Sequence, residues 1–258
     1  MPTLTQTNPT RKTLPTMYDL PSEEIGDAGM PDEYHVHQAI LLNETFKPVG
    51  IPADEVFSAV DMNLYYDEDH TKWYKRPDWF GVIGVPRLYD DYDMRWSYVV
   101  WDENTVPLIV VELLSPGTEK DDLGKTLRDV NEPPTKWEVY ESILRVPYYV
   151  VFSRQSVELK IFQFKGKGFK EVKNHSGRFW IPQANLGLGL WQGSYHGIEH
   201  LWLRWFDAES NWIPTDAERA EQARQHAELE SQRAELESQR AERLAEMLRQ
   251  LGQDPDQV

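Results

Sequence analysis

Two acidic residues, Asp78 and Glu112, are each set in a hydrophobic segment that is typical of a β-strand. Asp78 lies near the head of segment 76–85, and Glu112 lies within segment 107–116. An ionised carboxylate that is buried without a partner costs several kcal/mol or takes up a proton. Two carboxylates on neighbouring strands can instead share a divalent cation. The pair therefore predicts a metal site that activates water and stabilises the charge developing on a phosphate.

The expected ion is Mg²⁺ or Mn²⁺, which takes oxygen ligands and keeps several waters. The backbone carbonyl of Leu113 is placed by sequence to be a third protein ligand. In such sites a lysine usually follows the second acid by two residues, but that position here is Leu114. Lys136, at the start of an expected helix, is the first candidate for this cation. Lys120 and Lys125, in the preceding loop, are its competitors.

Two other interpretations of the acids stay open. In a purely structural one, Asp78 caps a strand entry and Glu112 forms a salt bridge with Lys136. Because the catalytic interpretation also places Lys136 near Glu112, proximity alone does not separate the two. In the other, the carboxylates act without a metal, as in a glycosidase. That mechanism needs one acid of raised pKa and a sugar cleft, and no pattern in the sequence specifically supports either.

The elements that must position these residues form a β-rich body with few helices. Thr135 is expected to cap a helix over 136–144, in which Trp137, Tyr140 and Leu144 share one face. The other expected elements are a short helix within 31–42, a polar loop at 117–134, and strands at 55–66, from Asp78 onward, and at 95–101, 108–114, 148–152, 158–164, 169–172, 186–191 and 198–206.

Three domains are expected along the chain. Residues 1–17 are rich in Thr and Pro and predict a flexible N-terminal arm. Residues 18–214 form the main domain. Residues 215–258 contain a seven-residue unit repeated in full and predict a charged helix. Since Glu230 and Glu237 weaken its heptad seam, a solvated helix or a loose homo-oligomer is favoured over a tight coiled coil.

Composition limits the classes of function. The chain has 258 residues and no cysteine, which excludes disulfides, zinc–thiolate sites and cysteine nucleophiles. Its net charge of −16 argues against a general nucleic-acid coat protein, so any contact with nucleic acid depends on a local basic patch, a metal or a narrow substrate. The sequence lacks an apolar run of about 20 residues and a signal-peptide pattern. We therefore expect no membrane association and a cytoplasmic location.

Several motifs together resemble the Uma2 family (formerly DUF820), which is abundant in cyanobacteria. They are Pro77-Asp78, the string from Glu112 to Thr118 (Glu-Leu-Leu-Ser-Pro-Gly-Thr), Asp122, Lys136-x-x-x-Tyr140 and Val146-Pro-Tyr-Tyr149. The sequence departs from the family pattern in an apparent insertion at 123–135 and in Tyr148, where the family often has Glu.

The resemblance implies an α/β restriction-endonuclease-like PD-(D/E)XK core, a mixed central sheet flanked by helices, with added β-rich segments and a long C-terminal helix. It also implies a Mg²⁺- or Mn²⁺-dependent endonuclease acting on nucleic acid, with DNA favoured over RNA. Asp78 and Glu112 would be catalytic metal ligands and Lys136 the catalytic lysine, moved from strand to helix. Asp122, Lys125 and Tyr140 would be accessory residues. The competing hypothesis is a catalytically degenerate fold that binds a partner through the C-terminal helix.

Overall fold

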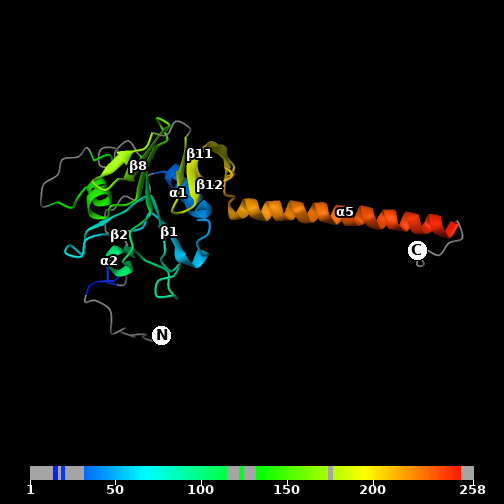
Figure 1. Cartoon of the computed structure of the whole chain (residues 1–258), viewed down its shortest axis with the longest axis horizontal. Helices are drawn as coiled ribbons and strands as arrows, with labels where there is room; N and C mark the ends of the chain where they lie inside the picture. The colour runs from blue at the N-terminus through cyan, green and yellow to red at the C-terminus, as the bar shows by residue number, and fades with distance from the viewer. Residues whose placement is uncertain are drawn as a thin grey trace. The chain divides into compact units, whose positions relative to one another are not determined.

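The computed structural model describes residues 14–16, 19–20, 32–114, 122–124, 132–173 and 177–250. The chain divides into two compact units, Met1–Ile213 and Pro214–Val258. The first unit is built on a six-stranded mixed sheet of order β1-β4-β6-β7-β8-β9 (Figure 1). This sheet, its covering helices and a long C-terminal helix confirm the expected fold class. None of the described helices is long and apolar enough to cross a lipid bilayer.

The central sheet brings the two acidic segments together. Strands β6 and β7 pair in parallel, and all other neighbours in the sheet are antiparallel. All five residues of β6 are buried, the acid Glu112 among them. The strands are β1 (Val56–Val60), β4 (Trp79–Ile83), β6 (Ile109–Leu113), β7 (Tyr148–Ser153), β8 (Glu158–Phe164) and β9 (Phe169–Glu171).

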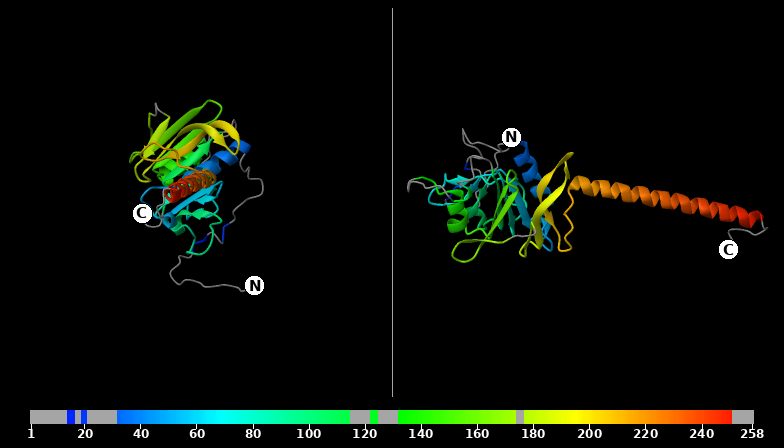
Figure 2. Two further views of the ribbon diagram at one scale, coloured as in Figure 1. Left: turned by 90° about the vertical axis from the view of Figure 1, so that its right-hand side faces the viewer. Right: turned by 90° about the horizontal axis from the view of Figure 1, so that it is seen from above.

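Helix α1 (Glu33–Thr45) packs between the central sheet and a second sheet (Figure 2). The second sheet has the order β10-β11-β12 and comprises β10 (Arg178–Ile181), β11 (Leu186–Tyr195) and β12 (Ile198–Phe206). The buried side chain of Gln38 in α1 bonds both backbone groups of Leu203, at 2.7 and 2.8 Å. These bonds satisfy its polar atoms inside an apolar layer and fix the helix against β12.

The opposite face of the central sheet is covered by a short helix in two parts. Helix α4 (Lys136–Glu138) continues into the π-helical turn η2 (Val139–Ile143). Thr135 caps α4 through a reciprocal pair of bonds with Glu138, which confirms the predicted cap. Val139 and Tyr140 pack against Val110 of β6 in the hydrophobic core on this face.

Two predicted strands are wrong. Segment 55–66 is not one strand, because Asp61 has a φ of 48° and separates β1 from β2 (Leu64–Tyr65). Segment 95–101 is a strand only at β5 (Tyr98–Val99), because the chain then turns into helix α2 (Val100–Glu103). A small sheet of order β3-β2-β5 includes β3 (Tyr74–Lys75), and a 3₁₀ turn η1 (Ala53–Glu55) precedes β1.

The second unit contains helix α5 (Asp216–Gln250), none of whose residues is buried. Salt bridges on its surface join residues three positions apart, such as Arg233 and Glu230 at 3.2 Å. Most of the expected N-terminal arm lies outside the described residues, as do Lys120, Lys125 and the string 115–118.

Candidate active site

Asp78 and Glu112 meet because β4 and β6 are antiparallel neighbours. Asp78 directly precedes β4, and Trp79 pairs with Val111, so Asp78 lies opposite Glu112. Two hydrogen bonds tie the segments: Leu113 N–H donates to Asp78 Oδ2 at 2.6 Å, and Asp78 N–H donates to Glu112 Oε2 at 3.4 Å. The strand pairing therefore brings the two acids side by side, as the sequence predicts.

Glu112 is the residue of β6 that faces the short helix. Side chains alternate along a strand, and Ile109, Val111 and Leu113 pack into the core on the α1 side. Glu112 therefore points to the other face, where it is 0 % exposed. Each of its oxygens has a partner there: Tyr140 Oη donates to Oε1 at 3.0 Å, and Lys136 Nζ lies 2.8 Å from Oε2.

Lys136 is placed by the capped start of α4. Its Nζ also lies 3.2 Å from Asp122 Oδ1, an ion pair that brings a third carboxylate into the cluster. The backbone oxygen of Asp122 accepts a bond of 2.9 Å from Tyr149 Oη, which anchors this part of the loop to β7. The side chain of Lys136 is 20 % exposed, against 0 % for Glu112 and 2 % for Asp122, so solvent reaches the cluster at Lys136 more than at the two acids.

Burial and an excess of negative charge perturb the acids. Burial raises the pKa of Glu112 to about 8, although Lys136 acts against this rise. Burial also raises the pKa of Asp78, again opposed by Lys136. Burial would by itself lower the pKa of Lys136, but Glu112, Asp122 and Asp78 outweigh it and raise that pKa. The folded protein therefore makes it costly to keep Glu112 and Asp78 both ionised.

His35 is a residue of this region that its sequence position does not reveal. Its Nε2 lies 3.0 Å from the carbonyl oxygen of Leu113, and its Nδ1 lies 2.8 Å from Asp32 Oδ1. Asp32 is also the N-cap of α1, so one carboxylate fixes both the helix start and the imidazole. The expected third ligand, the Leu113 carbonyl, therefore already has one partner, and its second lone pair remains.

The residues present fit a divalent cation in donor chemistry. Within the described part of the chain, no group of three or more His, Cys, Asp or Glu side chains is arranged to hold a metal ion. The donor set of Asp78, Glu112 and Leu113 is of a different kind, because it combines two carboxylates with one backbone oxygen. Beside it, the buried Asp122 Oδ1 lies 3.2 Å from Lys136 Nζ but accepts no well-aligned hydrogen bond from the described residues, which leaves it with capacity for a cation.

Comparison with known proteins places the chain in a family. The profile of the Uma2 family, described as "Putative restriction endonuclease", matches residues 12–195. A crystal structure described as a putative nuclease belonging to DUF820, from Anabaena variabilis ATCC 29413, is similar with a TM-score of 0.41 and 11 % identity, over 65 % of this chain and 89 % of that chain. No curated protein matches the sequence. Because the profile covers well over half of its length, the chain belongs to the Uma2 family.

Proposed function

We propose that this protein is a divalent-metal-dependent endonuclease that hydrolyses phosphodiester bonds in nucleic acid, with DNA favoured over RNA. The observation that carries the proposal is the buried cluster in which Lys136 Nζ lies 2.8 Å from Glu112 and 3.2 Å from Asp122, with Asp78 beside them. The description of the Uma2 family, "Putative restriction endonuclease", supports the same class of reaction.

The charges of the cluster favour binding of a divalent cation. Three carboxylates surround one ammonium, and the pKa of Glu112 is raised to about 8. Asp78, Glu112 and the Leu113 carbonyl would hold Mg²⁺ or Mn²⁺, with Asp122 as an accessory acid. Such an ion, when bound, lowers the pKa of a water and offsets the charge that develops on the phosphate.

The neighbouring side chains have distinct roles in this proposal. Lys136, whose side chain is partly exposed, is the catalytic lysine: its ammonium donates hydrogen bonds to a scissile phosphate or orients the attacking water. Tyr140 is an accessory positioning residue, since its hydroxyl holds Glu112 Oε1 at 3.0 Å and fixes the other oxygen toward Lys136. Lys125 lies outside the described residues and remains a further candidate from the loop.

Cleavage assays on matched variants test the proposal. The full chain is incubated with plasmid DNA, a single-stranded oligonucleotide and an RNA of the same sequence, each with Mg²⁺, Mn²⁺ or a chelator. We expect cleavage that needs the metal and that Asp78→Asn or Glu112→Gln abolishes. Glu199→Gln, an exposed glutamate of β12, is purified in parallel and retains activity. No cleavage of any substrate by the wild type, together with no Mn²⁺ binding, would refute the proposal.

A degenerate fold that serves as a binding module is the second candidate. It is favoured by α5, where Leu229, Leu236 and Leu244 are 56 %, 55 % and 61 % exposed, as in a helix that receives a partner or a second copy. Removing residues 215–258 separates the two candidates. An enzyme retains its cleavage activity, whereas a binding module loses its partner or its oligomeric state in light scattering.

A further inference from the structure

A local concentration of positive charge stands out in this acidic chain. Residues 160–173, which we call the basic hairpin, contain five lysines and one glutamate in a protein with a net charge of −16. They cover most of β8, the turn at 165–168 and strand β9. A patch of this sign is the electrostatic footprint expected of a surface that binds phosphates.

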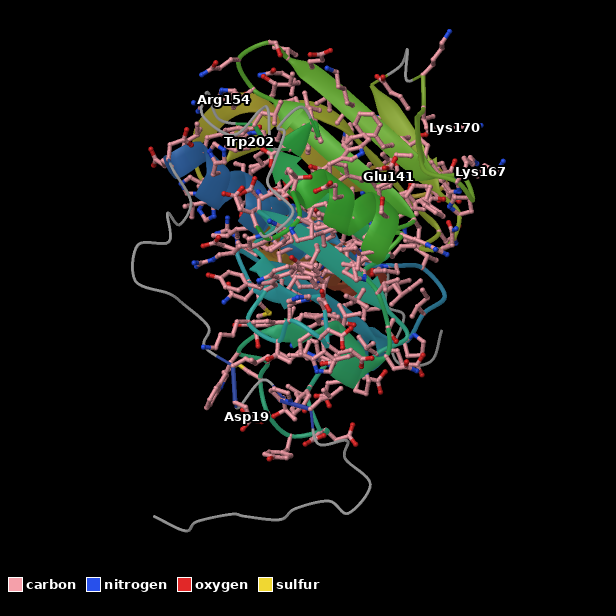
Figure 3. The ribbon with its side chains drawn as sticks, turned by 90° about the vertical axis from the view of Figure 1, so that its left-hand side faces the viewer. Asp19, Glu141, Arg154, Lys167, Lys170 and Trp202 are labelled. Atoms are coloured by element: carbon pink, nitrogen blue, oxygen red, sulfur yellow. The ribbon has the colours of Figure 1, made fainter. Side chains whose placement is uncertain are left out.

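Four of these lysines are free to bind a ligand. Lys165, Lys167, Lys170 and Lys173 are exposed, and none of them pairs with an acid among the residues that the structure covers. Lys160 differs, because its Nζ lies 3.1 Å from Glu158. In Figure 3, Lys167 and Lys170 lie together at one edge of the molecule, on the side of Glu141 away from Arg154 and Trp202.

The basic hairpin is held in a fixed position against the helix that carries Lys136. Glu141 of η2 accepts a bond of 2.8 Å from the backbone N–H of Phe169, at the start of β9. Trp137, the neighbour of Lys136, packs edge-on against Phe162 and Phe169, with ring centroids 4.9 and 5.3 Å apart. These contacts join the basic hairpin to the candidate site through one helix.

The separation along that helix suits a nucleic-acid strand. The anchor at Glu141 follows Lys136, the start of α4, by five positions, an advance of about 7.5 Å at 1.5 Å per residue. The phosphates of one strand of B-DNA advance by about 3.4 Å along the helix axis for each nucleotide. A strand whose scissile phosphate lies at Lys136 therefore reaches the root of the hairpin within about two to three nucleotides, and the lysines extend from there.

We infer that the basic hairpin binds the phosphate backbone of the nucleic acid that the candidate site cleaves, without reading its sequence. This inference rests on the proposed function.

Lysines also protect exposed edge strands from pairing with other chains, and β9 is the edge of its sheet. Edge protection alone predicts that loss of the lysines causes association of the protein and leaves nucleic-acid binding unchanged.

Binding of a fluorescein-labelled 30-base-pair duplex by fluorescence anisotropy tests the inference, with Ca²⁺ replacing Mg²⁺ and with salt varied. The triple variant Lys165→Gln/Lys167→Gln/Lys170→Gln should bind about tenfold or more weakly at 0.1 M salt. The slope of log K against log salt is negative, and its magnitude should decrease by up to about 2.7, at about 0.9 for each lost phosphate contact. A triple Lys→Arg variant keeps the charge and should keep the binding, while Lys72→Gln, at an exposed lysine elsewhere, is the single-site control.

Hydrolysis of bis(p-nitrophenyl) phosphate separates this inference from the proposed function. The small diester does not reach the basic hairpin, so the triple variant should hydrolyse it at the wild-type rate while losing activity on DNA. Unchanged DNA affinity and salt slope in that variant would overturn the inference, even if the wild type cleaves DNA. Wild-type protein that binds no duplex would overturn it as well. Salt-dependent binding without any hydrolysis would support nucleic-acid binding by the basic hairpin and would contradict only the proposed catalytic function.

Discussion

Lys136 and Tyr140 lie four residues apart on one helix, and each contacts a different oxygen of the Glu112 carboxylate. The two contacts, 2.8 Å from Nζ and 3.0 Å from the hydroxyl, leave the buried carboxylate little freedom to rotate. Residues at this spacing share a helix face, so a single short element, capped by Thr135, sets the orientation of the acid. The proposed metal ligand is thus oriented before any ion arrives.

Replacing the lysine should expose how much the fold depends on this pair. Lys136→Met leaves Glu112 buried without a counter-charge, and above about pH 8, where Glu112 is ionised, we expect the free energy of unfolding to fall by about 3–5 kcal/mol. The double variant Lys136→Met/Glu112→Gln removes both charges and should recover most of that loss. Urea denaturation of the four proteins in this cycle measures the coupling. Additive effects would show that the two groups do not interact.

The tyrosine contributes a single hydrogen bond. Tyr140→Phe keeps the packing of the ring but leaves Glu112 Oε1 without its donor, which should cost about 1–3 kcal/mol because the oxygen is buried. It should also raise the pKa of Glu112 further, since the lost bond stabilised the ionised form. Tyr148→Phe, which loses a part-buried bond to Gln183, is the matched control and should cost less. Equal losses of unfolding free energy in the two variants would mean that the bond to Glu112 contributes no more to stability than the bond to Gln183.

Stability should depend on pH through Glu112. Its pKa rises from an ordinary 4.5 to about 8 on folding, so the folded protein binds this proton more tightly than the unfolded chain does. The group therefore stabilises the fold fully below about pH 4.5, and this contribution is lost as the pH rises through about 8. Asp78 shifts in the same direction. The wild type should lose a few kcal/mol relative to Glu112→Gln between about pH 5 and 9.

Thermal denaturation across that range measures the difference, with Glu199→Gln as a reference for the removal of an exposed glutamate. A constant difference between the wild type and Glu112→Gln at every pH would contradict the raised pKa. The comparison is made between variants because many other carboxylates also titrate near the acidic end of the range.

Metal binding should compete with the proton on Glu112. Below about pH 8, the apparent affinity for Mn²⁺ is expected to rise about tenfold per pH unit as one proton is displaced, and to level off above it. Isothermal titration in buffers of different ionisation enthalpy gives the number of protons released. Asp78→Asn and Glu112→Gln should abolish the binding, whereas Asp54→Asn, at an exposed aspartate, should not. Affinity that is independent of pH would place the ion elsewhere.

The sequence predicts the parts of the fold in which one local pattern decides the outcome. The β-rich segment 108–114, which forms β6, and the helix cap at Thr135 appear in the structure as expected. Segment 95–101 has a similarly β-rich composition, yet its end coils into α2, which Asn104 terminates with a φ of 52°. Composition does not encode such a turn, because short-range bonds and packing override propensity there.

The candidate site was predictable to the extent that its residues lie in recognisable segments. Asp78, Glu112, Lys136 and Tyr140 meet in the structure; Glu112 lies on the expected strand, Lys136 and Tyr140 on the expected helix, and Asp78 directly before β4. His35 could not be found in this way, since 78 residues separate it from the carbonyl of Leu113 that it contacts. Its only local signal is Asp32, whose side chain serves both the helix cap and the imidazole.

The parallel pairing of β6 with β7 has a consequence for the order of folding. Parallel neighbours need a crossover connection, and the crossover between these strands carries Asp122, Lys136 and Tyr140. Pairing β7 with β6 therefore also brings these three residues to the sheet. The chain loses the conformational entropy of loop closure before the contacts of the cluster can offset that loss. Until this crossover has packed on the sheet, Glu112 lacks its contacts with Lys136 and Tyr140, so the carboxylate that β6 contributes is not yet held in one orientation.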